Sequence, residues 1–248
     1  MLNTESFSVL ENTKVTPAKE IPSVREIEEA DVELQKVVDW YSEFTQFITW
    51  PVIFLVSKIF FKINIKGRYN FKNVKGPFII IANHITHYDS FLFRIALGLW
   101  TRHLPLRFMA VDRFQWNFLN ILAKLGIIKA VYMLFGVFTV VPGRGIEENL
   151  KTPINIIKSG GSVVIYPEGK VVMDGKIGEF KNGAAALHRR TGAMVIPVLF
   201  RFSAKSSGFR RELSIVIGGP LSILDGFSDP EITESFRRSL LLLDEQVQ

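Results

Sequence analysis

Two side chains within the stretch Phe78–Phe93, those of His84 and Asp89, could act together in proton transfer. An imidazole takes up a proton near neutral pH. A carboxylate that accepts a hydrogen bond from one ring nitrogen leaves the other nitrogen free as a general base. The pair is therefore a candidate catalytic site.

The spacing of the pair sets a condition on the local structure. On one continuous helix, residues five apart would point about 140° away from each other. The run FIIIAN, residues 78–83, is typical of a buried strand, and Asp89 is a favoured residue at a helix start, where the amides stabilise its charge. We therefore expect His84 in a turn after a strand, the place where open α/β sheets gather catalytic groups.

Two other interpretations of this stretch remain open on the pair alone. A histidine at a strand end and an aspartate at a helix start can both be purely structural. A metal site is the third possibility, because His84, His87 and Asp89 superficially resemble the ligand string of metallo-β-lactamase-type hydrolases. That string needs one residue between its first two ligands and a further histidine after the aspartate. This chain has neither, so no metal is predicted.

Composition narrows the classes of partner and chemistry. The 248-residue chain has a formal net charge of +6, which favours an anionic partner such as a phospholipid surface or a phosphorylated substrate. Its basic residues are scattered rather than gathered into a run, so nucleic acid is not expected. It has no cysteine, which excludes disulfides, thiolate zinc sites and cysteine nucleophiles.

The N-terminal quarter divides into a polar tail and an apolar helical region. Residues 1–22 are polar and predict a flexible tail. Residues 23–63 predict a helical pair that breaks near Pro51, the first helix amphipathic and the second more apolar. Phenylalanine and tryptophan beside lysine are typical of helices that lie in a membrane interface. Packing on the protein's own core is the alternative.

Residues 64–248 predict a catalytic domain of the α/β class. Strands are predicted at 64–71, 76–83, 105–112, 138–143, 162–169, 193–202 and 212–219, and helices at 90–100, 114–134, 146–159 and 183–191. Strands separated by helices indicate a mixed, largely parallel sheet flanked by helices. The apolar segment 114–141 could pack in the core or wall an acyl-chain groove.

Four blocks, in order along the chain, carry a resemblance to a known family. They are Asn83–Asp89 (NHITHYD), Phe138–Arg144 (FTVVPGR), Tyr166–Gly169 (YPEG), and Phe180–Ala184 (FKNGA) followed by Val195–Val198 (VIPV). The first resembles the NHX4D motif of the glycerolipid acyltransferases, which act on 1-acylglycerol-3-phosphate or glycerol-3-phosphate. The others resemble the later blocks of that family, over residues 66 to 219, and the helical pair is similar to the membrane-seating element of some bacterial members.

The resemblance implies a reaction and roles for the first block. A fatty acyl group would pass from acyl-CoA or acyl carrier protein to a lysophospholipid hydroxyl, of 1-acylglycerol-3-phosphate above all, in phospholipid biosynthesis. His84 would be the base and Asp89 its orienting partner, while His87 falls at a variable position. No cofactor would be needed, and the protein would work on the cytoplasmic face of a membrane.

The resemblance also implies how the acceptor's phosphate is held. Arg144 would bind it, Glu168 would order the loop or bind an acceptor hydroxyl, and Gly169 would let a ligand approach the backbone. After the Glu-Gly pair the family continues Thr-Arg-Ser, whereas Lys170 and two valines follow Gly169 here. Lys170 would then supply a point charge in place of the missing arginine. This departure leaves open another lysophospholipid, alcohol or amine acceptor, or a catalytically weak membrane-binding member of the fold.

Overall fold

A computed structural model describes most of the chain. The described residues are 24–71, 74–86, 89–98, 101, 104–111, 117–172, 174–203, 209–223 and 226–247, without the side chains of 24–32, 111 and 117–120. The predicted flexible tail, residues 1–22, lies outside them, as does His87.

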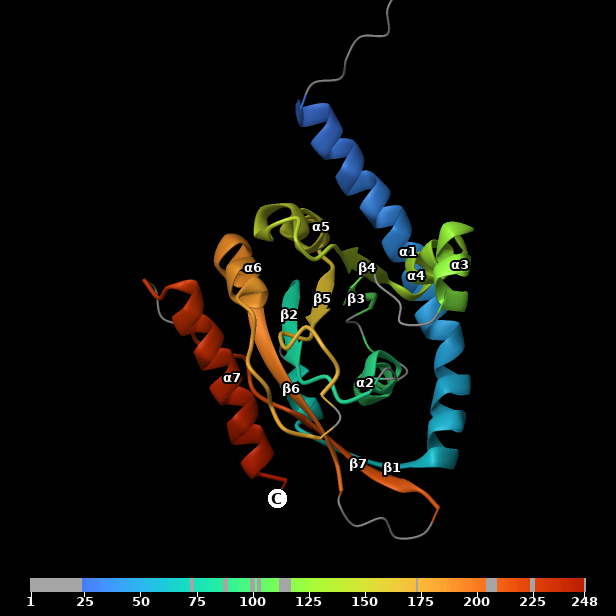
Figure 1. Cartoon of the computed structure of the whole chain (residues 1–248), viewed down its shortest axis with the longest axis vertical. Helices are drawn as coiled ribbons and strands as arrows, with labels where there is room; N and C mark the ends of the chain where they lie inside the picture. The colour runs from blue at the N-terminus through green and yellow to red at the C-terminus, as the bar shows by residue number, and fades with distance from the viewer. Residues whose placement is uncertain are drawn as a thin grey trace, which may run out of the picture.

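One sheet organises the described part of the chain (Figure 1). Its seven strands are β1 (Phe61–Lys66), β2 (Phe78–Ala82), β3 (Leu106–Val111), β4 (Val137–Val140), β5 (Ser162–Ile165), β6 (Met194–Phe202) and β7 (Arg211–Ile217). Their spatial order is β1-β7-β6-β2-β5-β3-β4. All neighbours are parallel except β6 and β7. The predicted mixed, largely parallel sheet is therefore confirmed.

Helices cover both faces of the sheet. They are α1 (Val24–Phe60), η1 (Arg68–Phe71), α2 (Asp89–Leu97), α3 (Asn117–Lys124), α4 (Ile127–Phe135), α5 (Ile146–Lys158), α6 (Gly183–Thr191) and α7 (Asp229–Glu245). Residues 64–71 were predicted as one strand. In the structure they form the end of β1 and the short helix η1. Positive φ of 75° at Gly67 ends that strand, because only glycine adopts this conformation without strain.

The central strand β2 shows why a continuous apolar run is needed in the sheet interior. Phe78, Ile80 and Ala82 join the core cluster under α1 and α2, whereas Ile79 and Ile81 join the cluster under α5, α6 and α7. Successive side chains of a strand point to opposite faces, and here both faces are covered. All five residues are fully buried, which fixes the position of the turn that follows at His84.

The predicted helical pair at the N-terminal end is wrong in one respect: α1 is a single helix that continues through Pro51. A proline inside a helix removes one backbone hydrogen bond and normally costs about 3 kcal/mol. Contacts on both sides of Pro51 keep one helix, because Gln46 bonds to β3 and Ile53 and Phe54 pack on the core. Figure 1 shows α1 along one side of the sheet, with its first turns extending beyond it.

Polar side chains fix the inner face of α1 to the sheet. The buried Gln46 amide donates to the Leu106 carbonyl at 2.7 Å and accepts from the Leu106 N–H at 3.1 Å. Asp39 forms a 3.0 Å ion pair with buried Arg107. Burial raises the pKa of the Asp39 carboxyl, an effect that Arg107 opposes. These contacts specify how α1 is placed, which an apolar face alone would not do.

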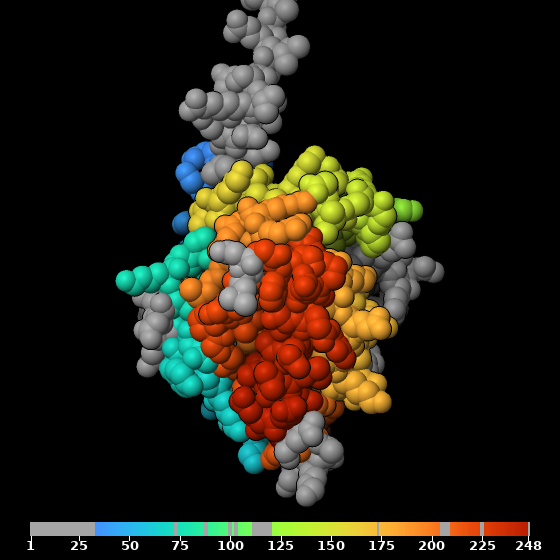
Figure 2. Space-filling model, turned by 90° about the vertical axis from the view of Figure 1, so that its left-hand side faces the viewer, coloured from blue at the N-terminus to red at the C-terminus, as the bar shows by residue number. Residues whose placement is uncertain are grey.

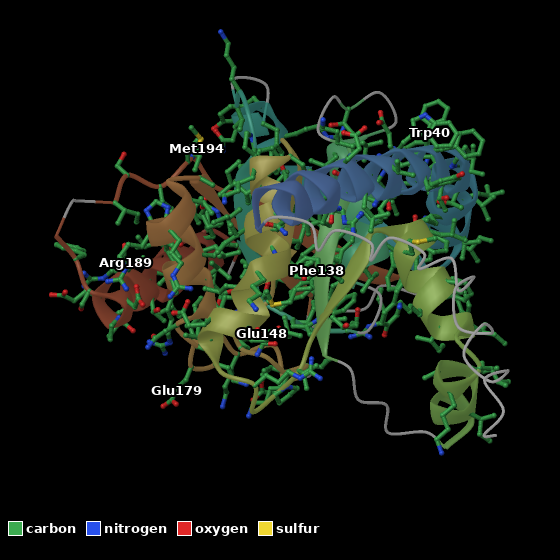
Figure 3. All side chains as sticks on the ribbon, turned by 90° about the horizontal axis from the view of Figure 1, so that it is seen from above. Trp40, Phe138, Glu148, Glu179, Arg189 and Met194 are labelled. Carbon is green, nitrogen blue, oxygen red and sulfur yellow. The ribbon has the colours of Figure 1, made fainter. Side chains whose placement is uncertain are left out.

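The outer face of α1 is apolar and exposed. Its residues recur every three or four positions and form what we call the outer stripe: Leu34, Val37, Tyr41, Phe44, Ile48, Val52, Leu55 and Ile59. Trp40, beside this stripe, lies on the outer side of α1 (Figure 3). Within the described residues, no helix has the length and apolarity needed to cross a membrane.

The C-terminal helix α7 was not among the predicted elements, although the sequence contains its start signal. Ser228 and Glu231 form a capping box with a proline in the first turn. The helix covers the side of the molecule opposite α1 (Figures 1 and 2). Arg237 on this helix donates to the Gly178 carbonyl at 3.0 Å, so α7 also supports the loop that leads into the site.

Candidate active site

The turn after β2 brings the predicted pair into contact. His84 Nδ1 lies 2.9 Å from Asp89 Oδ2. Asp89 begins α2, as expected, and its side chain is completely buried. Its carboxylate also accepts the N–H groups of Ile85 and Thr86 at 2.7 and 3.0 Å and the Thr86 hydroxyl at 2.6 Å. Four donors therefore orient the Asp89 side chain against the histidine ring.

Asn83 and Tyr166 fix the histidine from the sheet. The Asn83 side chain exchanges two hydrogen bonds with the backbone of Phe200 on β6, at 2.8 and 2.9 Å. The Tyr166 ring stacks on the His84 ring with centroids 4.2 Å apart. Burial, and then the charge of Asp89, raise the pKa of the Tyr166 hydroxyl, so it remains neutral. The imidazole is consequently held in one plane.

Glu168 couples the histidine turn to the loop after β5. Because β2 and β5 are parallel neighbours, their carboxyl ends lie side by side. Glu168 is buried, and its two oxygens accept the N–H groups of His84 at 3.0 Å and Gly178 at 2.9 Å. Burial raises the pKa of Glu168, and these two donors oppose the shift. Of its two predicted roles, the contacts agree with ordering the loop.

A cavity of about 1320 Å³ opens beside the histidine. His84, Gly169 and Lys170 line it together with apolar residues of β3, α4 and β4, and α1 contributes Gln46, Thr49 and Ile53. This volume exceeds the roughly 300–1,000 Å³ of common small-molecule pockets. From segment 114–141, Val131, Tyr132, Phe135, Val137 and Val140 line the cavity. Val137, Phe138 and Val140 also pack on the core, and an acyl-chain groove stays a prediction.

Arg144 lies apart from the other predicted residues. The structure brings His84, Asp89, Glu168, Gly169 and Lys170 together, and all but the buried carboxylates line the cavity. Arg144 is exposed in the turn after β4, near Glu148, whose pKa it helps to lower after Lys151. Its neighbours Gly143 and Gly145 line the cavity, but the arginine itself does not.

Three further residues of the site were missed by the sequence analysis. Tyr166 and Lys181 were quoted within their blocks but given no role, and both line the cavity. Arg94 also lines it as a buried cation, with a pKa that burial lowers to about 10. An arginine inside an otherwise apolar helix was the available signal for Arg94. Within the described residues, no group of three or more potential metal ligands gathers.

Replacing Glu168 tests the coupling between the two loops. A glutamine keeps the shape but presents an NH2 group to one of two N–H donors, so one buried amide loses its acceptor. We expect Glu168→Gln to lower the free energy of unfolding by about 1–3 kcal/mol. The His84 turn would also shift, lowering turnover roughly 10-fold or more, since small misplacements of catalytic groups reduce rates strongly.

Urea denaturation and initial rates measure these two effects. Glu179→Gln, an exposed carboxylate in the same loop, is the matched control and should change neither. Unaltered stability and turnover in Glu168→Gln would contradict the ordering role.

Comparisons with known proteins agree on the family. The model of the Acyltransferase family matches residues 62–201, more than half of the chain. The chain is 27% identical over 147 residues to the chloroplastic 1-acyl-sn-glycerol-3-phosphate acyltransferase LPAT1 of Arabidopsis thaliana, covering 59% of this chain and 38% of that protein. It is 28% identical over 124 residues to a probable 1-acyl-sn-glycerol-3-phosphate acyltransferase of Mycoplasma genitalium, covering 50% and 44%.

Both matches span less than half the length of the relative. A solved structure shares the fold: the 1-acyl-sn-glycerophosphate acyltransferase PlsC of Thermotoga maritima superposes with a TM-score of 0.55 at 19% identity, over 90% of this chain and 84% of that one. The family model covers the histidine turn, the loop after β5 and the parallel core of the sheet. This chain belongs to the Acyltransferase family.

Proposed function

We propose that this chain transfers a fatty acyl group from acyl-CoA or acyl carrier protein to a hydroxyl of a lysophospholipid, and that the acceptor is 1-acylglycerol-3-phosphate. The observation that carries this proposal is the oriented His84–Asp89 pair in the wall of a large, mainly apolar cavity. The acceptor named for the relatives from Arabidopsis thaliana and Mycoplasma genitalium supports the choice of acceptor.

In this proposal, the reaction proceeds by general-base catalysis. Because Nδ1 of His84 is bonded to Asp89, Nε2 is the atom that takes the proton of the acceptor hydroxyl. The oxygen attacks the thioester carbonyl carbon, the new C–O bond forms, and the tetrahedral intermediate collapses with cleavage of the C–S bond. The leaving thiolate recovers the proton from the imidazolium, so the products are an ester and a free thiol.

In this proposal, the outer stripe is the surface that binds the membrane. The same helix that carries the outer stripe also lines the cavity through Gln46, Thr49 and Ile53. An extended exposed apolar face marks a surface for membrane or partner, and a lipid substrate must reach the cavity from a membrane. With the chain's net charge of +6, we propose attachment to the anionic cytoplasmic face of a membrane.

Thiol release from an acyl-CoA by the purified protein in detergent tests the proposed reaction. A panel of lysophospholipids and neutral alcohols serves as acceptors, with acyl carrier protein as a second donor. Release that requires 1-acylglycerol-3-phosphate supports the proposal. Release with a different acceptor would replace the substrate, and no release with either donor would indicate a membrane-binding protein without the reaction.

The outer stripe can be tested separately from catalysis. We expect Ile48→Ser with Leu55→Ser to weaken binding to phosphatidylglycerol-containing vesicles roughly 10-fold or more, at about 1 kcal/mol for each half-exposed side chain. Both side chains point away from the core, at 50% and 66% exposure, so stability should hold.

Phe227→Ser with Leu242→Ser is the control for this variant. Both residues are exposed and apolar; Phe227 lies just before α7 and Leu242 lies on it. Helix α7 covers the side of the molecule opposite α1 (Figures 1 and 2). Vesicle co-sedimentation should show a loss for the α1 pair alone. If both double variants bind vesicles equally well, the outer stripe is not the membrane-binding surface.

A further inference from the structure

The cationic side chains of the catalytic cavity have different surroundings. Within the described chain, three lysine or arginine residues line it: Arg94, Lys170 and Lys181. Arg94 is buried, and its Nη1 donates to the Gly98 carbonyl at 2.6 Å, so it supports the end of its own helix. Lys170 and Lys181 are exposed toward the cavity. These two are the cations that a soluble anionic group can reach there.

The position of Lys181 is set by the loop that contains Glu168. Its backbone N–H donates to the Pro167 carbonyl at 2.9 Å. Its amine lies 2.7 Å from the point that a Cβ on Gly169 would occupy, so the side chain crosses the backbone of Gly169. Any side chain at residue 169 would displace this amine. The glycine, with a φ of 66°, therefore serves the placement of Lys181 as well as the turn.

No carboxylate of the described residues forms an ion pair with Lys181. Both oxygens of Glu168 accept backbone N–H groups, and Asp89 is buried against His84. Neither Lys170 nor Lys181 forms an ion pair with a described residue, whereas many other basic residues of the chain do, among them Lys62, Arg107, Arg190 and Arg201. Both residues line the same cavity without an ion-pair partner among the described residues, so an anion that reaches these amines meets charge that no carboxylate already pairs with.

We propose that Lys181 binds the acceptor's phosphate, with Lys170 as the second cation, and so makes the site selective for phosphomonoester acceptors. This inference rests on the proposed function and names the residue that determines its substrate class. A phosphomonoester carries up to two negative charges near neutral pH, more than the phosphodiester of other lysophospholipids. Two lysines match that charge as point cations, without the planar fork of an arginine.

The same geometry argues against Arg144 as the main phosphate ligand. Arg144 is exposed outside the cavity wall, and it acts on the charge of Glu148. Lys181 lies on the same loop as Tyr166, whose ring stacks on the catalytic histidine. A phosphate bound by Lys181 is therefore held by the same loop that positions His84. This common support sets where the acceptor hydroxyl lies relative to the histidine.

Acceptor selectivity is the measurement that tests this proposal. With saturating acyl-CoA, kcat/KM is determined for 1-acylglycerol-3-phosphate, 1-acylglycerol and lysophosphatidylcholine. We expect Lys181→Gln to lower the value for the phosphomonoester roughly 10- to 100-fold, the loss of a charge-assisted hydrogen bond, and to change the other two by less than about 3-fold. The KM for acyl-CoA should not move.

Two variants serve as comparisons. Lys176→Gln removes an exposed lysine of the same loop that does not line the cavity, and it should behave as the parent. Arg144→Gln should reduce the phosphomonoester value less than Lys181→Gln. An equal loss with all three acceptors in Lys181→Gln, or a larger phosphomonoester loss in Arg144→Gln, would overturn the assignment.

A binding measurement separates this proposal from the proposed reaction. Calorimetric titration with a short-chain 1-acylglycerol-3-phosphate, below its micellar concentration, needs no turnover. Binding by the parent that weakens at least about 10-fold in Lys181→Gln supports the site. Equal binding by both proteins, or none by the parent, overturns it. If binding depends on Lys181 while no acceptor gives thiol release, the reaction fails and the phosphate site stands.

Discussion

His84→Ala should abolish acyl transfer, lowering turnover at least about 10²–10⁴-fold, which is the usual contribution of a positioned general base. The imidazole is the group held by Asp89 and stacked on Tyr166 at the cavity wall. Without it, the proposed reaction loses its general base. Thiol release under saturating donor and acceptor measures the loss.

The fold should survive this change, because the His84 side chain is 21% exposed and the Asp89 carboxylate keeps three other donors. Urea denaturation and vesicle binding should match the parent. His188→Gln is a suitable control, since His188 lies on α6 and bonds to the Ala193 carbonyl, which a glutamine can also reach. Near-normal turnover in His84→Ala would contradict general-base catalysis by His84.

Asp89→Asn should reduce turnover to a similar degree, roughly 10²–10⁴-fold, although the side chain keeps its size. The amide presents NH2 where the carboxylate accepts hydrogen bonds, and it cannot stabilise an imidazolium as an anion does. Because Asp89 is fully buried with four donors, at least one donor also loses its acceptor. The free energy of unfolding should fall by about 1–3 kcal/mol.

Asp229→Asn separates the loss of a helix-start aspartate from the loss of this particular contact. Asp229 begins α7 and pairs with Arg189 at 3.1 Å, on the side of the molecule away from α1. Its variant should retain turnover. If Asp89→Asn keeps full turnover while losing stability, then Asp89 is a structural cap, the alternative that the sequence left open.

The sequence predicted the sheet because its core strands are apolar on both faces. FIIIA of β2 and SVVI of β5 are buried completely or nearly so, and such runs specify central parallel strands wherever the helices between them can return to the sheet. The helix boundaries at Asp89, Ile146 and Gly183 also agree with the prediction. Local signals were sufficient for these elements.

The sequence could not decide the course of α1 at Pro51. A proline locally favours a break, and residues 44–57 carry no charge that would show which face is buried. The outcome depends on contacts with Leu106 and Phe135, which lie about 60 and 90 positions away in the chain. These tertiary contacts decide that α1 continues, and they outweigh the local preference of proline for a break.

For the site, the sequence predicted the candidate catalytic pair and the loop that lies beside it. His84 and Asp89 can meet only across a strand-to-helix turn, and Glu168 and Gly169 follow the neighbouring strand. Which of the basic side chains face the cavity depends on tertiary packing. Arg144 and Lys181 occur in equally suggestive blocks, but the turn after β4 leaves the arginine exposed outside the wall, while Gly169 leaves room for the lysine amine. Side-chain direction depends on the packing of loops from distant strands, which no local pattern encodes.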